Sequence, residues 1–287
     1  MSRLALFGPG YCGSRIADAL AGRGWIVEAI GRATPAGAAR DAIGRATHLI
    51  STVPPQGEAD PVLSTHRAAI TARPGLWLGY LSSTGVYGDT GGAWVDESAP
   101  LAGRRGGRMA ADCAWQALGA CVLRLPGIYG PGRSMLDRLA AGQAHRIELP
   151  GQVFSRIHVD DIVAGVLAAI ACDAAGVYNL ADDLPAPQNI LVETACALLG
   201  RAPPPLVGLA AAGLSPAARA FYAENRRVAN GRATRVLGWR PRYPDYRAGL
   251  AACLAAQSAA IASASALTSS RGLAQCVTSR ISPSAQW

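Results

Sequence analysis

Six residues near the N-terminus have the types and spacing to bind a diphosphate. Residues 8–13 read Gly-Pro-Gly-Tyr-Cys-Gly and match the pattern G-x-G-x-x-G. The first glycine permits a tight turn, the second lets the backbone approach a pyrophosphate, and the third lets a helix pack closely on a strand. Amides at the start of that helix then face the phosphates. The predicted dinucleotide-binding residues of this turn are Gly8, Gly10, Tyr11, Cys12 and Gly13.

The end of the second strand indicates which dinucleotide binds. An NAD site has Asp or Glu there, about 20 residues after the turn, to bind the ribose 2′-hydroxyl. This chain reads Ile30-Gly31-Arg32, and a guanidinium pairs with a 2′-phosphate instead. The sequence therefore favours NADP. NAD stays open as the alternative, with Glu28 as its acidic residue, although Glu28 lies inside the strand rather than at its end.

A second stretch could bind an anion but could not protonate it. Residues 101–112 read LAGRRGGRMAAD, with three arginines and neither tyrosine nor lysine. The guanidinium groups of Arg104, Arg105 and Arg108 suit a phosphate or a carboxylate. A guanidinium stays protonated near neutral pH, so it cannot serve as an acid. The whole chain contains no lysine, which excludes a Schiff-base lysine and a lysine-bearing phosphate loop.

These residues need a parallel sheet to position them. Leu4–Phe7, Ser14–Arg23 and Trp25–Ile30 have the patterns of strand, helix and strand, which make a β-α-β unit. Strand and helix patterns continue to alternate, so we expect an α/β fold with a Rossmann-like, doubly wound parallel sheet and a small C-terminal substrate lobe. Only fourteen residues, 33–46, precede the next strand at 47–53. They can hold one helix, so the third strand of such a sheet is expected to be missing or vestigial.

The expected domains are discontinuous in the sequence. Residues 1–133 and 156–184 form the NAD(P)-binding Rossmann domain, and residues 134–155 and 185–252 form the substrate lobe. Residues 256–287 are rich in alanine and serine and contain no acidic residue. This tail is expected to be a frayed helix followed by a disordered segment, without catalytic function.

Composition narrows the set of partners. The net charge is +8, but the 27 basic residues, all arginine, are dispersed and only 6% of the chain is aromatic, which is not typical of a nucleic-acid-binding face. The chain has no apolar run of membrane-spanning length and no secretory signal. Its seven cysteines and four histidines lack metal-ligand spacing. We expect a cytoplasmic monomer or homodimer in a reducing compartment, with a small-molecule substrate and no metal, membrane or nucleic-acid partner.

Five later stretches occur in a characteristic order. They read YLSSTGVYGD (80–89), VLRLPGIYGPGR (122–133), RIHVDDIVAG (156–165), VYNLADDLP (177–185) and LGWRPRYPDYRAGL (237–250). With the glycine turn, they resemble the extended short-chain dehydrogenase/reductase superfamily, of the NAD-dependent epimerase/dehydratase type. The resemblance covers residue 4 to about residue 252. More narrowly, it points to an atypical branch that lacks the Tyr-x-x-x-Lys dyad of the superfamily.

The resemblance implies roles for individual residues. Ser83, which precedes Tyr87 by four places, would be the catalytic hydroxyl that hydrogen-bonds the substrate. Arg133 would face the substrate, and Pro126 and Ile128 would back the nicotinamide. The coenzyme ribose would lie along the strand end formed by Ser51, Thr52, Val53 and Pro54.

The resemblance also places the dyad's Tyr and Lys at Arg104 and Arg108. Arg108 would keep the ribose contact and the positive charge, and so would serve both catalysis and coenzyme binding, whereas Arg104 would contact the substrate. No tyrosine lies between Tyr87 and Tyr129. These two tyrosines are therefore the candidate substitute proton donors, although packing is the simpler role for each.

The expected activity follows from these assignments. The chain is expected to be an NAD(P)-dependent oxidoreductase or a sugar-nucleotide epimerase/dehydratase-like enzyme with a degenerate active site. It would prefer NADP and act on an anionic or nucleotide-sugar-like metabolite. The alternative is a catalytically inactive, NADP-binding sensor or regulatory protein. The missing dyad favours the sensor, and Ser83 with the nicotinamide-side residues favours the enzyme.

Overall fold

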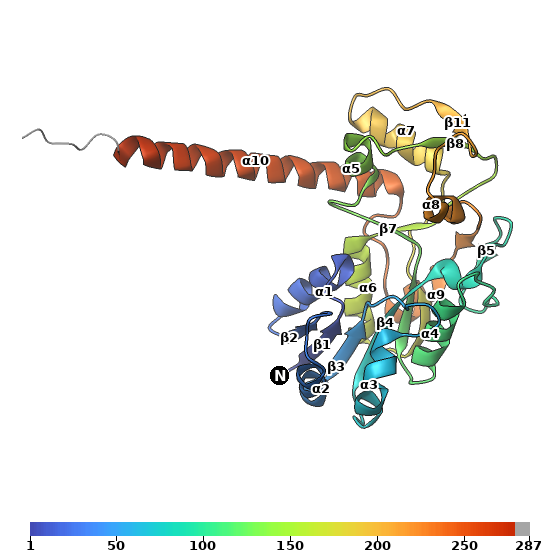
Figure 1. The fold of residues 1–287 in the computed structure, drawn as a ribbon, viewed down its shortest axis with the longest axis vertical. Coiled ribbons are helices and arrows are strands. Elements are labelled where there is room, and N and C mark those ends of the chain that lie inside the picture. The colour runs from blue at the N-terminus through green and yellow to red at the C-terminus, as the bar shows by residue number, and fades with distance from the viewer. Residues whose placement is uncertain (279–287) are drawn as a thin grey trace, which may run out of the picture.

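The central element is a six-stranded parallel sheet. The computed structural model describes residues 1–278, except for the side chains of residues 217–218 and 264–278. The strands lie in the order β10-β6-β4-β3-β1-β2, and every neighbouring pair is parallel (Figure 1). They are β1 (Arg3–Phe7), β2 (Ile26–Ile30), β3 (His48–Ser51), β4 (Trp77–Ser83), β6 (Cys121–Leu125) and β10 (Gly176–Asn179).

Strand β2 is an edge of this sheet, and within residues 1–278 no strand pairs with its outer side. α2 (Ala36–Arg45) follows β2 and leads directly to β3, which pairs with the opposite side of β1. A single helix thus fills the short segment after Arg32. The expected α/β fold, with the third Rossmann strand missing, is confirmed.

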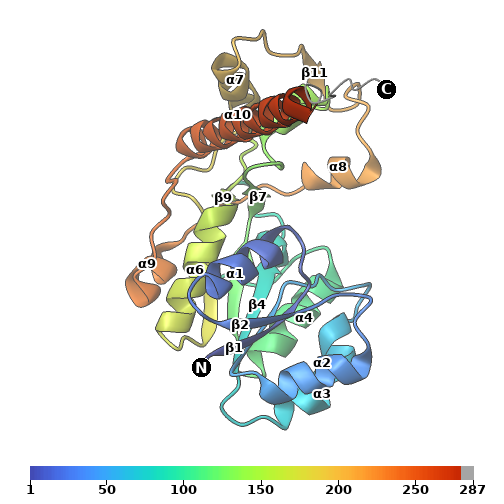
Figure 2. The same ribbon diagram turned by 90° about the vertical axis from the view of Figure 1, so that its left-hand side faces the viewer.

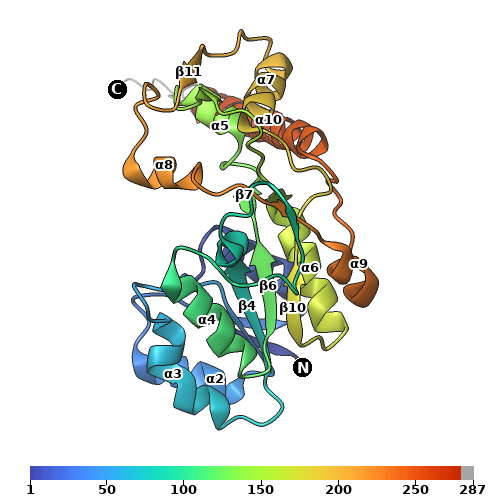
Figure 3. The same cartoon turned by 90° about the vertical axis from the view of Figure 1, so that its right-hand side faces the viewer.

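Helices cover both faces of the sheet. α1 (Tyr11–Ala21) and α6 (Val159–Ala171) lie on one face, whereas α2, α3 (Pro61–Thr71) and α4 (Gly106–Gln116) lie on the other. Figures 2 and 3 show these two layers from opposite sides. Because side chains alternate along a strand, Leu4 and Leu6 of β1 join the core cluster under α1 and α6, whereas Ala5 and Phe7 join the cluster under α2, α3 and α4.

The small lobe lies beyond the carboxyl ends of the strands (Figure 1). Its buried core includes Met135, Leu136, Leu191, Val192 and Leu250. Its elements are α5 (Met135–Ala140), β8 (Arg146–Glu148), α7 (Gln188–Leu198), β11 (Leu206–Gly208), α8 (Pro216–Phe221) and the start of α10 (Tyr246–Thr278).

Two short parallel pairs connect the large domain with the lobe. β7 (Gly127–Tyr129) pairs with β9 (Arg156–His158), and β5 (Trp94–Val95) pairs with β12 (Arg227–Val228). These pairs hold the lobe next to the carboxyl ends of the sheet strands. A ligand site of this fold is expected at those strand ends.

One segment of the expected lobe packs on the large domain instead. α9 (Gly231–Leu237) falls within 185–252, yet Ala233, Leu237 and Trp239 belong to the core cluster under α6. The Trp239 indole donates to the carbonyl oxygen of Asp161 at 3.0 Å. Residues 185–252 therefore do not all belong to the lobe, because α9 packs on the large domain before the chain continues into α10.

The C-terminal segment also differs from the expectation. α10 continues as one helix to Thr278 and projects away from the body (Figure 1), so residues 256–278 are helical, and residues 279–287 lie outside the described part. Alanine, the strongest helix former, is frequent from Tyr246 to Thr278, and proline is absent there. No helix described here is both long and apolar enough to cross a membrane.

Candidate functional site

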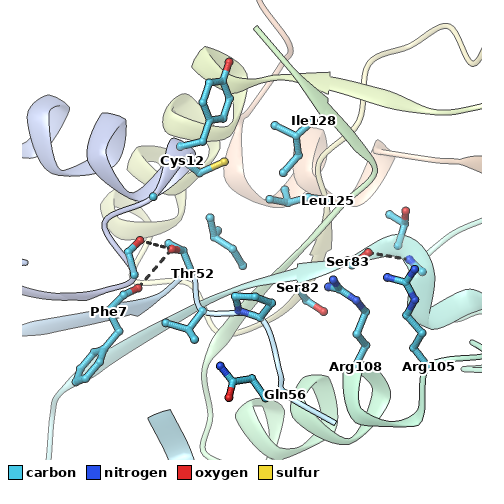
Figure 4. A pocket seen from close by; sticks show the side chains of 18 of the residues that line it. Phe7, Cys12, Thr52, Gln56, Ser82, Ser83, Arg105, Arg108, Leu125 and Ile128 are labelled. Carbon is cyan, nitrogen blue, oxygen red and sulfur yellow. Dashed lines mark hydrogen bonds between the residues drawn. The ribbon is translucent and has the colours of Figure 1, made fainter. Parts of the chain in front are cut away.

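A cavity of about 1140 Å³ lies at the carboxyl edge of the sheet. One side is formed by the glycine turn and the ends of β2, β3, β4 and β6, and the other by parts of residues 153–155 and 220–228. Figure 4 shows Cys12 and Thr52 on one side of it and Arg105 and Arg108 pointing toward the strand end at Ser82 and Ser83. The cavity therefore joins the expected dinucleotide turn to the expected substrate residues.

The glycine turn has the geometry of a phosphate cradle. Gly8 has a φ of 85°, which favours glycine. A Cβ at Gly13 would collide with the carbonyl oxygen of Gly8, whereas nothing lies within 4 Å of a Cβ at Gly10. The N-cap of α1, Gly10, has no side-chain capping bond, so the first-turn amides of α1 remain available to an anion. These residues fit the diphosphate of a dinucleotide.

The end of β3 supports this turn. Thr52 Oγ1 donates to the carbonyl oxygen of Gly8 at 2.6 Å, and Thr52, Val53 and Pro54 all line the cavity. Ser51 does not line it. Ser51 is fully buried and its Oγ lies 3.4 Å from the Val53 amide that donates to it. The expected ribose contact of the Ser51 side chain is therefore wrong, because that side chain is buried and does not reach the cavity.

Arg32 and Glu28 occupy different positions relative to the cavity. Arg32 lines it, is exposed, and makes no ion pair or hydrogen bond within the described residues. Glu28 pairs with Arg45 at 2.6 Å and with Arg3 at 3.9 Å, and the hydrogen bond from Arg45 lowers the pKa of the Glu28 carboxyl. The carboxylate offered as the NAD alternative is thus already engaged away from the site.

Ser83 has its hydroxyl at the cavity wall. It precedes the 3₁₀ turn Thr84–Tyr87 and its Oγ accepts from the Gly85 amide at 3.1 Å. That bond leaves the Ser83 proton free to be donated to a substrate oxygen. Pro126 and Ile128 line the cavity near Leu125, where the resemblance places the nicotinamide.

Tyr87 belongs to a buried network behind the cavity. Its hydroxyl donates to Asn179 Oδ1 at 2.7 Å and accepts from Arg124 Nη1 at 3.0 Å. Arg124 is also paired with Asp112 at 2.7 Å, and Ser82 Oγ donates to Asp112 at 2.6 Å. Tyr87 is 1% exposed and does not line the cavity. Its expected role as a substitute acid is wrong, because its hydroxyl donates one hydrogen bond and accepts another within the buried network, away from the cavity.

Tyr129 is likewise removed from the site. Its ring packs edge-on against His158, and its hydroxyl lies against Gly249 without a hydrogen-bond partner among the described residues. Burial raises the pKa of Tyr129, which opposes proton release. The described residues that line the cavity include one tyrosine, Tyr11. Its hydroxyl donates to the carbonyl oxygen of Pro131 at 3.2 Å, and burial raises its pKa to about 12.

Arg104 faces the lobe rather than a reacting group. Its Nε donates to Glu224 Oε1 at 3.0 Å and its Nη2 to the carbonyl oxygen of Ala220 at 2.6 Å. Arg226 Nη1 bonds the other oxygen of Glu224 at 2.7 Å and the carbonyl oxygen of Gly88 at 2.7 Å. Arg104 still borders the cavity, but its guanidinium links the two domains, so the substrate role expected for it is replaced by a structural one.

Arg105 and Arg108 keep their guanidinium groups toward the cavity. Neither has an ion pair or hydrogen bond from its side chain among the described residues. Burial, together with the charge of Arg105, lowers the pKa of Arg108. A glycine is required at 107, because a Cβ there would collide with the carbonyl oxygen of Gly57, whereas a Cβ at Gly106 would meet only the movable end of the Glu58 side chain.

Arg133 lines the cavity as expected, with its guanidinium 5.4 Å from the centre of the Tyr11 ring. The sequence did not indicate many of the lining residues, and they include Gln56, His66, Phe154, Phe221, Glu224 and Arg226. The last four come from the lobe, where no motif marks them. In the described part of the chain, no group of three or more acidic, histidine or cysteine side chains could hold a metal ion.

Comparison with solved structures shows the fold and one close relative. A protein from Silicibacter pomeroyi, described as functionally unknown and conserved, is 41% identical, with a TM-score of 0.80 over 90% of this chain and 99% of that chain. A dTDP-glucose 4,6-dehydratase from Bacillus anthracis in complex with NAD is 16% identical, with a TM-score of 0.71 over 88% of this chain and 95% of that one. A human epimerase family protein with NADPH is 20% identical, with a TM-score of 0.70 over 86% and 97% of the two chains.

A curated relative matches part of the sequence. A 3-diazoavenalumate denitrifying reductase from a Streptomyces species is 35% identical over 144 residues, which make up 46% of this chain and 46% of that protein. The match thus spans about half the length of the reductase. No protein-family model matches the chain.

Proposed function

We propose that the chain is an NADP-preferring oxidoreductase or epimerase-like enzyme of the short-chain dehydrogenase/reductase superfamily. The chain belongs to one family with the Silicibacter pomeroyi protein. One observation carries this proposal. The uncapped start of α1 and the hydroxyl of Ser83 open on the same cavity. A dinucleotide on the former would bring its nicotinamide toward the latter.

The chain's own side chains would hold the coenzyme at several points. The α1 amides would bind the diphosphate, Arg32 would pair with a 2′-phosphate, and Arg108 would contact the nicotinamide ribose. Pro126 and Ile128 would cover one face of the nicotinamide. When bound, the nicotinamide supplies or accepts a hydride. The proposed preference for NADP rests on Arg32, which has no ion-pair partner among the described residues, and on Glu28, which is engaged by Arg45.

The substrate would be oriented by Ser83 and stabilised by positive charge. Ser83 would donate its free proton as a hydrogen bond to a substrate oxygen. Arg105 and Arg108 would stabilise negative charge that develops during the reaction. Among the described residues, the one tyrosine that lines the cavity is Tyr11, whose hydroxyl is bonded to the Pro131 carbonyl oxygen and whose pKa is raised by burial. A proton that the reaction requires would therefore come from water.

The second candidate is the NADP-binding sensor. The observation that favours it is the placement of Tyr87 and Tyr129 away from the cavity, which removes a general acid worth about 10²–10⁴-fold in rate. A sensor would bind NADPH and release it unchanged.

Two measurements test these candidates. We expect fluorescence titration to show tighter binding of NADPH than NADH, and Arg32→Ala to reduce that preference about tenfold, as for a charge-assisted hydrogen bond at an exposed site. Arg23→Ala is the matched control, since Arg23 is exposed at the far end of α1. An unchanged preference in Arg32→Ala would reject the phosphate assignment. Oxidation of NADPH by carbonyl compounds, keto-sugar nucleotides included, that Ser83→Ala abolishes would favour the enzyme, and binding without turnover would favour the sensor.

A further inference from the structure

Arg226 lines the cavity from the segment just before β12, and only one nitrogen of its guanidinium is engaged. Nη1 donates to Glu224 Oε2 and to the carbonyl oxygen of Gly88, both at 2.7 Å. Nη2 makes no hydrogen bond with any of the described residues. The two bonds at Nη1 hold the planar guanidinium in place, and Nη2 is left to donate to a ligand.

The surroundings of Gly85 place this free nitrogen near the hydroxyl of Ser83. A Cβ at Gly85 would lie 3.2 Å from Ser83 Oγ and 3.9 Å from Arg226 Nη2, and these are the described atoms within 4 Å of it apart from its chain neighbours. The two polar atoms are therefore no farther apart than these two distances together, which is little more than two hydrogen bonds end to end. All three residues line the cavity, and the missing side chain of Gly85 keeps the space beside both donors open.

The wall that carries Arg226 keeps a positive charge. Glu224 shares its carboxylate between Arg226 at 2.7 Å and Arg104 at 3.0 Å, so one negative charge offsets only one of the two guanidinium groups. Burial opposes ionisation of Glu224, but hydrogen bonds from Arg226 and Arg104 outweigh it and lower the pKa of the carboxyl. Positive charge thus remains available at this wall for an oxygen that becomes negative.

We propose that the substrate is a carbonyl compound whose oxygen accepts hydrogen bonds from both Ser83 Oγ and Arg226 Nη2. This rests on the proposed function, because it names the second donor and the substrate class of the same site. When the carbonyl carbon of the substrate accepts a hydride, its π electron pair moves onto the oxygen, and the hydride donor, the reduced nicotinamide, is oxidised. Ser83 and Arg226 stabilise the resulting alkoxide, which then takes a proton from water and leaves hydroxide. Arg226 thus replaces the hydrogen bond of the missing phenol but not its proton.

The first test compares Arg226 with Arg104, the other arginine that bonds Glu224. NADPH affinity is measured first, and kcat and KM of the full chain are then determined with methylglyoxal, benzaldehyde and phenanthrenequinone as carbonyl probes. Arg226→Gln is expected to lower kcat about 10²-fold, as the removal of one oxyanion donor does, at unchanged NADPH affinity. Arg226→Lys, which keeps the charge, should recover part of kcat. Arg104→Gln is the matched control, because it removes an equivalent bond to Glu224 but no donor near Ser83, and its kcat should stay near that of the unmodified chain.

A second variant fills the space without removing a donor. In Gly85→Ala the added methyl would lie 3.2 Å from Ser83 Oγ and 3.9 Å from Arg226 Nη2, where it would hinder the approach of a substrate oxygen. We expect kcat/KM to fall for each probe that is reduced, at unchanged NADPH affinity and melting temperature. Gly44→Ala is its control, since Gly44 is exposed on α2 and nothing lies within 4 Å of a Cβ there.

A binding measurement makes the test independent of turnover. Acetate carries a negatively charged oxygen, as the alkoxide does, and it is titrated by ligand-observed NMR into the full chain, both loaded with oxidised NADP and free of coenzyme. We expect acetate to bind, and Arg226→Gln to weaken its binding at least about tenfold, as for the loss of a hydrogen bond to a charged group. Arg104→Gln should bind acetate as the unmodified chain does.

The outcomes separate this inference from the proposed function. An unchanged kcat in Arg226→Gln, or an equal loss in Arg226→Gln and Arg104→Gln, overturns the inference and leaves the proposed function standing. If none of the three probes is reduced, acetate decides, and either no binding or binding that Arg226→Gln leaves unchanged overturns the inference. A chain that binds neither NADPH nor NADH overturns the proposed function, and acetate binding to the coenzyme-free chain that Arg226→Gln abolishes would still support the pair of donors.

Discussion

Removal of the Asp112 carboxylate is expected to destabilise the protein strongly. The Asp112 and Arg124 side chains are 0% and 3% exposed, and two nitrogens of the guanidinium bond the carboxylate at 2.7 and 3.1 Å. In Asp112→Ala the Arg124 charge would stay buried without its partner. Breaking a buried pair in this way costs about 3–5 kcal/mol. That is a large part of the roughly 5–15 kcal/mol by which native proteins are stable.

Urea unfolding followed by circular dichroism measures this change in the free energy of unfolding. The double variant Asp112→Ala/Arg124→Leu serves as the reference, since it removes the buried charge as well as its partner. It is expected to be more stable than Asp112→Ala alone. The reasoning would be refuted if Asp112→Ala cost less than about 1 kcal/mol, or if the double variant were less stable than the single one.

The same network predicts the behaviour of Tyr87. In Tyr87→Phe, Arg124 Nη1 and Asn179 Oδ1 would each lose a partner, which costs about 1–3 kcal/mol in a buried site. NADPH affinity and any turnover are expected to stay unchanged, because the hydroxyl does not reach the cavity. Loss of turnover at unchanged stability would restore Tyr87 as the proton donor.

Three further predictions follow from single features of the structure. Gly13→Ala is expected to weaken NADPH binding by at least about tenfold in fluorescence titration, because its Cβ would collide with the Gly8 carbonyl, whereas Gly10→Ala, with no atom within 4 Å of its Cβ, should fold normally. Burial raises the pKa of Asp182 to about 8, above the value of about 3.9 in unfolded chains. The stability from this group is therefore present below about pH 4 and is lost as the pH rises to about 8, and melting temperatures of Asp182→Asn should decline less over that range. Truncation after Ala260 is expected to leave the melting temperature within about 2 °C of the full chain, because the bond from Gln257 to Asp137, at 2.8 Å, precedes the cut; a larger loss would show that the projecting end of α10 supports the fold.

Much of the fold could be predicted because it depends on local patterns and on chain length. The turn Gly8–Gly13, the strand before it and the helix after it are set by glycine geometry and apolar spacing over a few residues. The missing third strand followed from counting the residues after Arg32. The packing of α9 on the large domain could not be predicted from chain length, because it depends on contacts between residues distant in sequence, such as the hydrogen bond from Trp239 to Asp161.

Side-chain direction explains most errors at the site. Ser82 and Ser83 are neighbours on β4, yet Ser82 bonds the buried Asp112 and Ser83 borders the cavity. The resemblance predicted a substrate contact for Ser83, which does line the cavity, whereas Ser51 and Tyr87, also assigned to the site, do not line it. The Tyr87 hydroxyl is buried where Asn179 and Arg124, both distant in sequence, complete its hydrogen bonds. Ser51 is buried as well, and its hydroxyl accepts from the Val53 amide two residues away.

The exchange of a phenol for guanidinium groups changes the chemistry that the cavity can favour. A guanidinium stabilises developing negative charge but releases no proton near neutral pH. The cavity therefore favours reactions in which negative charge develops on the substrate, and water would have to supply any proton. A sensor would need Arg32 and Arg108 for the coenzyme, but it would have no use for Arg105. Arg105 lines the cavity beside Arg108 without an ion pair among the described residues, and a bound anion other than the coenzyme would give that charge a partner. Loss of turnover at unchanged NADPH affinity in Arg105→Gln would therefore favour the enzyme over the sensor.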